Sequence, residues 1–237
     1  MEKYRSIATA IEQKIISVEY KPGEMLPDQN QLAKEYKTAR VTIQKAVKIL
    51  IREGLIYSKR GSGTYVKKNV MMNSRSFHSD GTVGTSKRID ATQNIVTKVI
   101  SYDVRFPTEK ESEILMIGVE QPIYDIIRLR IVDEEPLKLE HTILPVEVVP
   151  NLTKEILLQS IYDYLINELK LHPSGASRVI RASKSTDLDK ECLKSDIHDP
   201  ILEVEQIVYL ENGTPIEYST SRSRYDAVEY ILHNAEL

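Results

Sequence analysis

Hydrophobic residues in the first part of the chain recur at the spacing of α-helices. In the segment 38–54 the apolar residues lie at i, i+3, i+4, i+7 and i+8, which forms one continuous stripe on a helix; they are Ile43, Ala46, Val47, Leu50 and Ile51. We expect Thr38 to cap this helix and Gly54 to end it. The other side carries a mostly cationic ridge, formed by Arg40, Gln44, Lys45, Lys48 and Arg52.

Shorter elements flank this helix in the sequence. Asp28 can cap a short helix whose inner side is Leu32, Ala33 and Tyr36, and a first helix is predicted over residues 4–18. After the long helix, residues 55–58 and 64–67 alternate as strands do, on either side of a basic, glycine-rich tip. Two helices joined by a tight turn and followed by a hairpin form a winged helix-turn-helix, which inserts its second helix into a DNA major groove.

The pattern changes after residue 68. Residues 68–94 are polar and rich in Gly, Ser, Thr and Asn, which predicts a linker followed by a loop. Strands are then predicted over residues 95–105, 123–132, 137–144, 176–185, 201–210 and 215–224. Helices are predicted over residues 108–117, 153–169 and 187–193. Long antiparallel strands with helices beside them indicate an α+β domain.

The formal charge divides the chain at the same place. The net charge is −3, but residues 1–70 carry 14 Lys and Arg against 7 Asp and Glu, whereas the remainder carries 18 against 28. A basic segment attached to an acidic one is typical of a nucleic-acid-binding head on a different kind of body. One cysteine, scattered histidines and the lack of a long apolar run or signal peptide predict a cytoplasmic protein without disulfide, metal or membrane span.

Candidate DNA contacts follow from the predicted second helix and hairpin. Arg40 is the best candidate for a base contact, since a guanidinium can bind guanine O6 and N7 together. We expect Thr42 and Lys45 to meet phosphate, while Gln44 either reads adenine or hydrogen-bonds water. The hairpin tip would approach a minor groove through Gly61, Gly63, Lys59 and Arg60. Taken alone, the cationic ridge is equally typical of a solvated helix face.

The segment KPGEMLPDQNQLAKEYKTARVTIQKAVKILIREGLIYSKRGSGTYV resembles the winged helix of GntR-type bacterial transcription regulators. A proline-glycine turn, a leucine-proline pair, the T-x-x-x-A helix and the G-x-G-T wing occur in the family's order, over about the first 70 residues. The family commonly has arginine where this chain has Asn30 and Gln44. Both residues remain candidates for DNA contact, and the family's operator sequence does not carry over.

Charged residues in the predicted strands are candidates for a ligand site in the second domain. Arg128 and Arg130 are two residues apart in an apolar strand, so both side chains leave the same face. On the inner face they would form a clamp for a dianion, whereas on the outer face they would be ordinary surface arginines. Glu140 and Glu217 each follow a hairpin turn, where they would accept sugar hydroxyl hydrogens or serve as surface charges or arginine partners.

The segments IIRLRIVDEEPLKLEHTILP, QSIYDYL and YLENGTPIEYSTSRSRYD resemble the UTRA effector-binding domain of the HutC subgroup of GntR regulators, whose fold is similar to chorismate lyase. The resemblance implies that Arg128, Arg130 and Ser160 hold a phosphate and that Glu140, Tyr162 and Glu217 line the sugar end. It also implies roles for Arg224, which matches an arginine of the family's C-terminal segment, and for the Ser76-Phe77-His78 stretch, where the family usually contacts phosphate.

Together these observations predict a DNA-binding domain at residues 1–68, a linker and loop at 69–94, and an effector and dimerisation domain at 95–237. We expect a homodimeric, cytoplasmic repressor without cofactor or catalytic residues, which binds a pseudo-palindromic operator and releases it when a sugar phosphate binds. The resemblance is greatest to trehalose-operon-type repressors and favours a disaccharide phosphate. Two alternatives remain: an amino-acid-pathway or fatty-acid effector, or an enzyme of chorismate-lyase-like fold.

Overall fold

The structure is a computed structural model that describes residues 3–59, 61–68, 76–78 and 94–231. The described residues before position 80, together with those from Tyr230 onward, form one compact unit, and residues 94–229 form the other. Each unit is described by itself. No helix in the described part of the chain is both long and apolar enough to span a bilayer.

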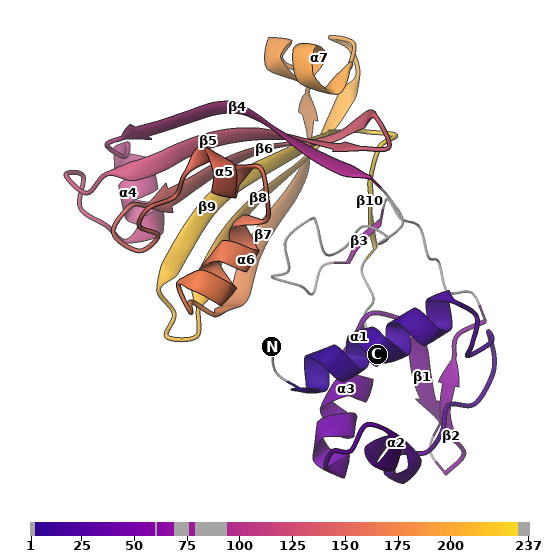
Figure 1. Cartoon of the computed structure of the whole chain (residues 1–237). Coiled ribbons are helices and arrows are strands. Elements are labelled where there is room, and N and C mark those ends of the chain that lie inside the picture. Colours follow the sequence, from indigo (N-terminus) through magenta and orange to yellow (C-terminus); the bar gives the residue numbers. More distant parts are fainter. Residues whose placement is uncertain (1–2, 60, 69–75, 79–93, 232–237) are drawn as a thin grey trace. The chain divides into compact units, whose positions relative to one another are not determined.

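The N-terminal unit is a winged helix-turn-helix, as the sequence predicts (Figure 1). Its elements are α1 (Lys3–Ile16), α2 (Gln29–Glu35), α3 (Arg40–Arg52), β1 (Ile56–Lys59) and β2 (Gly63–Val66). The stripe on α3 is the centre of its core, where Ile43 and Leu50 are fully buried against Ile11 of α1 and Leu32 of α2. A second short pair of strands joins β3 (Ser76–His78) to β10 (Glu229–Ile231).

The start of α3 differs from the prediction. Thr38 does not cap this helix, because its backbone N–H donates to the carbonyl of Ala33 and so still belongs to the turn that ends α2. The capping position is Ala39, which has no side-chain oxygen to accept a hydrogen bond. By contrast, Asp28 caps α2 as predicted: its carboxylate accepts from the N–H groups of Asn30 and Gln31 in a capping box.

The tip of the wing requires glycine. The hairpin pairs Ile56 with Val66 and Lys59 with Gly63. Gly61 and Gly63 have φ angles of 74° and 130°, which other residues adopt only with strain. A Cβ atom on Gly63 would also approach the Met25 sulfur at 3.0 Å. These two glycines therefore fix the shape of the tip in addition to leaving its surface open.

The C-terminal unit is a six-stranded antiparallel sheet in the order β4-β5-β6-β9-β8-β7 (Figure 1). Its strands are β4 (Ile95–Arg105), β5 (Ile123–Val132), β6 (Glu135–Pro145), β7 (Pro173–Lys184), β8 (Pro200–Leu210) and β9 (Pro215–Arg224). Its helices are α4 (Glu109–Leu115), α5 (Lys154–Leu157), α6 (Ile161–Asp163), the π-helix η2 (Tyr164–Glu168) and α7 (Asp187–Leu193). The prediction of an α+β domain with an antiparallel sheet is confirmed.

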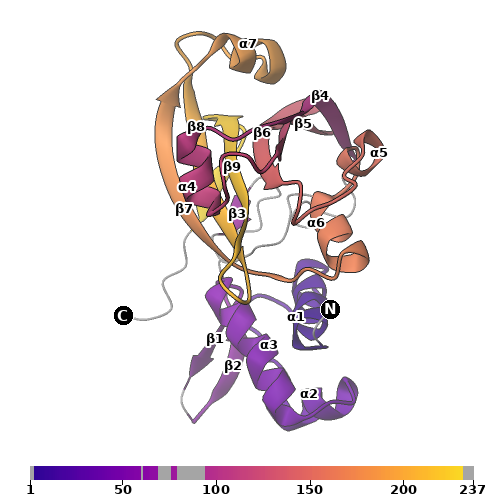
Figure 2. The ribbon, with the colours of Figure 1, turned by 90° about the vertical axis from the view of Figure 1, so that its left-hand side faces the viewer.

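Helices cover both faces of this sheet, and Figure 2 shows α7 on one side and α5 and α6 on the other. We call the face beneath α5, α6 and η2 the inner face; its core packs Leu157, Ile161 and Leu165 against Ile126 of β5 and Leu144 of β6. We call the opposite face, on which α4 and α7 pack, the outer face. The apolar run of β5 follows from this arrangement, because a central strand covered on both faces loses the alternation of polar and apolar residues.

The predicted single helix over residues 153–169 is wrong. The chain forms α5, breaks at Gln159, restarts with Ser160 as the N-cap of α6, and then widens into the π-helix η2. The break has a cause in the neighbouring strand, because Arg128 donates to the carbonyl oxygens of Leu157 and Gln159. Those carbonyls lie at the end of α5, where no helical N–H group remains for them.

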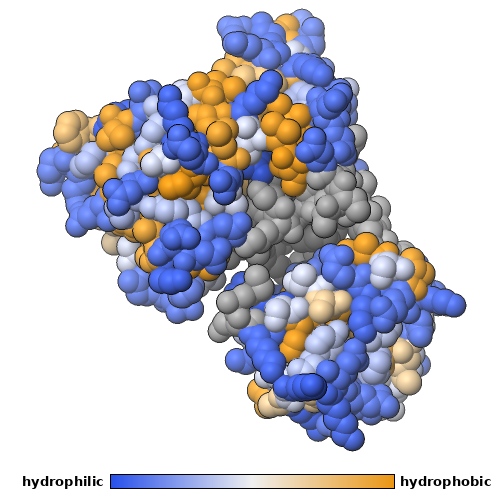
Figure 3. Space-filling model, in the orientation of Figure 1, coloured by the Kyte–Doolittle hydropathy of each residue, from blue (hydrophilic) through white to orange (hydrophobic). Residues whose placement is uncertain are grey.

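The edge strands keep hydrophobic residues at the surface. Val96, Ile100 and Val104 of β4 and Val179 and Ile180 of β7 are exposed. Figure 3 shows hydrophobic residues interspersed with hydrophilic ones over the visible face of the C-terminal unit. Within the part of the chain that the structure describes, β4 and β7 each pair with one strand of this sheet, so a further strand or another protein surface can cover the outer edge of each.

We expect one ion-pair cluster of the outer face to make stability depend on acid. Arg105 donates two hydrogen bonds to Glu111 at 2.7 and 2.8 Å and lowers the pKa of that carboxyl to about 2 from its ordinary 4.5. A lowered pKa stabilises the fold above pH 4.5, and this contribution, at most about 3 kcal/mol, is lost as the pH decreases toward 2. Glu111→Gln should therefore lower the unfolding midpoint in urea at pH 7 but flatten its decrease between pH 5 and 3.

Thermal or urea unfolding of the two proteins at several pH values measures this difference. Glu113→Gln, a change at an exposed carboxylate on the same helix, is the matched control and should leave the pH profile unchanged. An unaltered acid profile in Glu111→Gln would contradict the assignment.

Candidate DNA-binding face and effector-binding cluster

Most of the predicted DNA-contacting residues are exposed on the N-terminal unit. Helix α3 presents Arg40, Gln44 and Lys45 to solvent, while Thr42 is half-buried. Asn30 is exposed at the start of α2, and Lys59, Gly61 and Gly63 are exposed at the tip of the wing. Arg60 lies outside the described residues. Except for Asn30, the exposed candidates lie on one recognition helix and one hairpin. This is the geometry expected of a protein that reads a groove and contacts its flanking phosphates.

The guanidinium of Arg40 is held by the neighbouring helix. Its Nε donates to the side-chain oxygen of Gln29, at the first position of α2, over 3.2 Å. Because Nε takes this contact, the two terminal nitrogens remain for a bidentate contact with guanine. Gln29 accepts the bond through a neutral amide, so the positive charge of Arg40 is not cancelled by a carboxylate.

Lys45 has a different neighbour. Its ammonium nitrogen lies 5.4 Å from the centroid of the Tyr4 ring, which belongs to α1. A cation at this distance from an aromatic ring is attracted to it while its hydrogens stay available to solvent or phosphate. This arrangement suits a contact that fixes the position of the protein on DNA more than one that reads a base.

In the C-terminal unit, the two arginines of β5 lie on the inner face. Arg128 and Arg130 are only 7% and 3% exposed, which excludes the ordinary surface location. Arg128 is paired across the sheet with Glu140 of β6, and Arg130 with Lys138. The Nη2 of Arg128 donates to Glu140 at 3.0 Å, and Lys138 approaches the other oxygen of Glu140 at 3.6 Å. We call these four side chains the basic end of the inner face.

A second polar group lies further across the same face. The carboxylate of Glu217 on β9 accepts hydrogen bonds from Tyr162, Gln206 and Ser219, at 2.9, 2.9 and 2.6 Å. Gln206 in turn accepts from Nε of Arg178 on the edge strand β7. We call these five side chains the amide end. Three donors occupy most of the acceptor sites of Glu217, so this carboxylate chiefly orients its neighbours.

Burial changes the acidity of two groups in these clusters. It lowers the pKa of the Arg130 guanidinium, and the Arg128 charge lowers it further, while Glu140 opposes both. It also raises the pKa of Tyr162 well above its usual value, and the negative charge of Glu217 adds to this. Tyr162 is thus a hydrogen-bond donor at neutral pH, and the basic end carries charge that solvent does not stabilise.

The structure brings together Arg128, Glu140, Tyr162, Glu217 and Arg130 on one face, but not every predicted effector-binding residue joins them. Arg224 points to the outer face, where it binds Asp226 at 2.5 Å and the carbonyl of Lys194. The residue is an odd number of positions from Glu217 on the same strand, and odd spacing in a strand means opposite faces.

Ser160 and His78 need separate comment. Ser160 is not in mid-helix: its Oγ accepts from the N–H of Asp163 as the cap of α6, which leaves its hydroxyl hydrogen to donate elsewhere. Its neighbour Gln159 contacts Arg128, so the cap lies beside the basic end. His78 lies in β3, and its side chain is outside what the structure describes.

Sequence reasoning missed four residues of these clusters, namely Lys138, Arg178, Gln206 and Ser219. Each is a polar residue in a predicted strand. What identifies such residues is the register between the strands, because it shows which side chains of neighbouring strands lie side by side. Thr142 lies beside Ser219, Ser219 beside Gln206, and Gln206 beside Arg178, so one row crosses four strands. Finding this row from the sequence requires the order of the strands, which the sequence pattern does not give.

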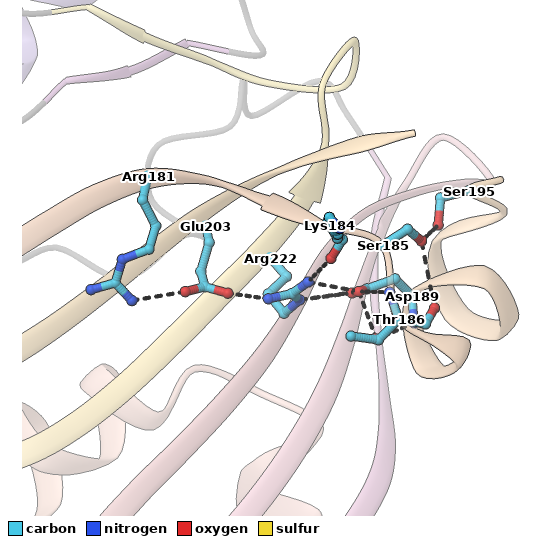
Figure 4. A network of polar contacts seen from close by, with 8 residues as sticks. All are labelled: Arg181, Lys184, Ser185, Thr186, Asp189, Ser195, Glu203 and Arg222. Atoms are coloured by element: carbon cyan, nitrogen blue, oxygen red, sulfur yellow. Dashed lines mark hydrogen bonds and ion pairs between the residues drawn. The ribbon is translucent and has the colours of Figure 1, made fainter. Parts of the chain in front are cut away.

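The outer face carries a different network, which joins α7 to the sheet (Figure 4). Asp189 is fully buried and receives Arg222 of β9 through two nitrogens, at 3.0 and 2.9 Å. Burial alone would raise the pKa of Asp189, but hydrogen bonds from Arg222 and Thr186 outweigh burial and lower it. Arg222 also binds Glu203, which Arg181 binds in turn. These partners satisfy one another, so we assign the network to the attachment of α7.

A pocket on the outer face lies between α4 and the sheet, with Lys110, His141 and Tyr218 in its lining. Its charged groups have partners inside the protein: His141 contacts Asp125 at 2.7 Å, and Lys110 lies over the Tyr218 ring. It contains none of the predicted effector-binding residues. In the described part of the chain, no three His, Cys, Asp or Glu side chains gather as a metal site would require.

Comparison with known proteins agrees with both halves of the chain. Residues 3–66 match the family "Bacterial regulatory proteins, gntR family", and residues 90–229 match the UTRA domain. The HTH-type transcriptional regulator GmuR of Bacillus subtilis is 37% identical over 226 residues, 95% of each chain. The mannosyl-D-glycerate transport/metabolism system repressor MngR of Escherichia coli is 28% identical over 97% of this chain and 94% of its own. The crystal structure of YydK from B. subtilis superposes with a TM-score of 0.79 at 29% identity, covering 99% of this chain and 100% of that one.

Proposed function

Since the chain belongs to the gntR family of bacterial regulatory proteins and carries a UTRA domain, we propose that it is a homodimeric, cytoplasmic repressor which a phosphorylated sugar releases from its operator. DNA-binding transcription regulation itself follows from the family. The proposal adds the chemical class of the effector, the direction of the response and the assembly. The single observation that carries the effector class is the buried basic end.

The charge of the basic end supports an anionic effector. On the inner face of β5 and β6 the charged residues are Arg128, Arg130, Lys138 and Glu140, three cations against one carboxylate. Three buried cations gathered at one place favour an anion beside them. Guanidinium groups present forked donors that match the oxygens of a phosphate, so an esterified phosphate fits this end by charge and by geometry.

The amide end supports a polyhydroxylated body on the same effector. Tyr162, Gln206, Ser219 and Arg178 offer hydroxyl, amide and guanidinium groups in a row, as sugar hydroxyls require. From β5 to β8 the sheet crosses three strand spacings, or about 14 Å. A ligand that reaches from the basic end to the amide end is thus longer than one hexose ring. The name of the relative MngR also points to a glycosylated compound.

A dimer fits this function because two DNA-binding heads match two half-sites of a pseudo-palindromic operator. The exposed hydrophobic residues of the edge strands β4 and β7 offer surface for a second copy. Release requires the effector to bind one arrangement of the heads more tightly than the other, since equal affinity for both would shift nothing.

A release assay tests the proposed function. Operator fragments are first selected by the full-length protein from random duplexes, and the complex is then titrated with sugars, sugar phosphates, histidine-pathway metabolites and fatty acids. We expect release by a phosphorylated sugar and not by its unphosphorylated form. The same compound at 100 times its Kd should stabilise the protein by about 2.7 kcal/mol, which appears as a higher Tm.

Release by a fatty acid or an amino-acid metabolite, without effect of any sugar phosphate, would refute the effector class and leave the DNA-binding function intact. Product analysis of the same incubations covers the enzyme alternative, because turnover of a sugar phosphate would show catalysis.

A further inference from the structure

We propose that Ser62 and Tyr65 form a clasp that holds the tip of the wing in its DNA-binding shape before DNA is present. Both are positioning residues, because they act on DNA through the backbone of the tip. The inference rests on the DNA-binding function of the family and on the predicted approach of Gly61 and Gly63 to a minor groove. It adds two hydroxyl groups that are not among the predicted DNA contacts.

The tip of the wing is rich in glycine and is therefore costly to order. Its turn lies between the paired residues Lys59 and Gly63, and the N–H of Ser62 donates to the carbonyl of Lys59 at 3.0 Å to close it. Glycine loses more conformational freedom than any other residue when its backbone is fixed. A tip that becomes ordered only on binding would weaken attachment to DNA, whereas one ordered in advance avoids this cost.

The clasp joins the tip to strand β2. The Tyr65 hydroxyl donates to the carbonyl of Ser62 at 3.2 Å, and the Ser62 Oγ lies 2.8 Å from the same hydroxyl. When the tyrosine hydrogen points to the carbonyl, the serine hydroxyl can donate to the tyrosine oxygen, so both bonds form together. The backbone and the side chain of Ser62 are thus both held, at the position between Gly61 and Gly63.

The ring of Tyr65 has neighbours on both sides. Tyr57 of β1 pairs with Tyr65, and their rings stack with centroids 5.6 Å apart and an angle of 24° between the planes. On the other side of β2, Met25 forms a bridge with Tyr65. These contacts keep the hydroxyl within reach of the tip. A phenylalanine at position 65 would keep the stacked ring and lose only the hydroxyl.

The clasp lies away from the core of the N-terminal unit. Ile56 and Val66 are fully buried on the core side of the hairpin, and strand alternation places Tyr57 and Tyr65 on the opposite side. Tyr57 is 42% exposed, and Ser62 is exposed at the tip. Loss of the clasp should therefore alter the shape of the tip and leave the stability of the unit nearly unchanged.

A double-mutant cycle on the full-length protein tests the clasp. Tyr65→Phe removes both hydrogen bonds and should weaken binding to the selected operator about 2- to 10-fold for each wing. Ser62→Ala should weaken it less, because the bond from Tyr65 to the carbonyl remains. The double variant should bind no more weakly than Tyr65→Phe, since two hydroxyls that act as one unit are not additive.

Hydrogen exchange separates positioning from a general loss of structure. In the protein without DNA, the Ser62 amide should exchange faster in Tyr65→Phe than in wild type, because the turn that it closes opens more often. In the operator complex the difference should disappear. The Tm of every variant should stay at the wild-type value.

Tyr57→Phe is the matched control, because it changes a tyrosine of the same hairpin but keeps the stacked ring and both hydroxyls of the clasp. It should bind the operator like wild type. Additive losses in the cycle would show that the two hydroxyls contact DNA separately and would overturn the clasp. Wild-type affinity in Tyr65→Phe, or a Tm that decreases together with affinity, would also overturn it. Operator binding by wild type would stand in each case, so the DNA-binding function is tested separately.

Discussion

Replacing Arg130 with methionine is expected to abolish the response to the effector while operator binding remains at the wild-type level. The side chain is 3% exposed and belongs to the basic end. Loss of one partner from a buried, hydrogen-bonded charge pair costs about 2–5 kcal/mol of binding, or roughly 30-fold to several thousand-fold in affinity. Methionine keeps most of the volume, so the core around β5 should stay filled. Effector titration of the operator complex measures the change.

Arg224→Met is the matched control, because this arginine lies on the outer face and pairs with Asp226. It should respond to effector like wild type. A normal response in Arg130→Met, with operator binding preserved in both variants, would exclude a phosphate clamp on β5 and favour an uncharged or non-sugar ligand.

Arg128 is the less informative position, although its side chain is equally well placed for an anion. Its guanidinium also donates hydrogen bonds to the carbonyls of Leu157 and Gln159 and to the carboxylate of Glu140. Arg128→Ala would leave these acceptors without their donor, at a cost of about 1–3 kcal/mol for each buried group. Loss of induction in that variant would therefore mix ligand binding with stability.

Local signals were sufficient for most of the fold. The bounds of β4, β5, β9 and α7 agree with the sequence pattern, because each is delimited by a proline, a capping residue or a turn. The helix over residues 153–169 could not be predicted in its real form. At its break the carbonyls of Leu157 and Gln159 accept hydrogen bonds from Arg128, a residue far away in the sequence.

The face on which Arg128 and Arg130 lie was undecidable from the strand alone. Both faces of β5 are covered by helices, so the alternation that normally distinguishes inside from outside is missing. Lys138 could not be identified from the sequence for a related reason. The β5–β6 hairpin changes register between Arg130 and Ile131, so counting outward from the turn places residues one position away from their real partners.

Replacing Arg40 with alanine is the change expected to affect DNA recognition most. Its terminal nitrogens are available for a guanine because Nε is held by Gln29. Loss of a bidentate contact costs about 1–3 kcal/mol of discrimination per half-site, and a dimer loses it twice. Affinity for the selected operator should decrease sharply, while affinity for unrelated duplex of the same length should change little. Fluorescence anisotropy with both duplexes measures the ratio.

Comparison with Lys45→Ala distinguishes reading a base from holding the backbone. Lys45 is exposed beside Tyr4 and is expected to contact phosphate, so its loss should weaken binding to operator and unrelated duplex equally and reduce the salt slope by about 2, one for each subunit of the dimer. Gln29→Ala should also decrease the affinity for the operator, but by less than Arg40→Ala does, because the arginine remains and only its orientation is lost. If Arg40→Ala weakened both duplexes equally, Arg40 would be a phosphate contact, and the operator sequence would have to be read by other residues of α3.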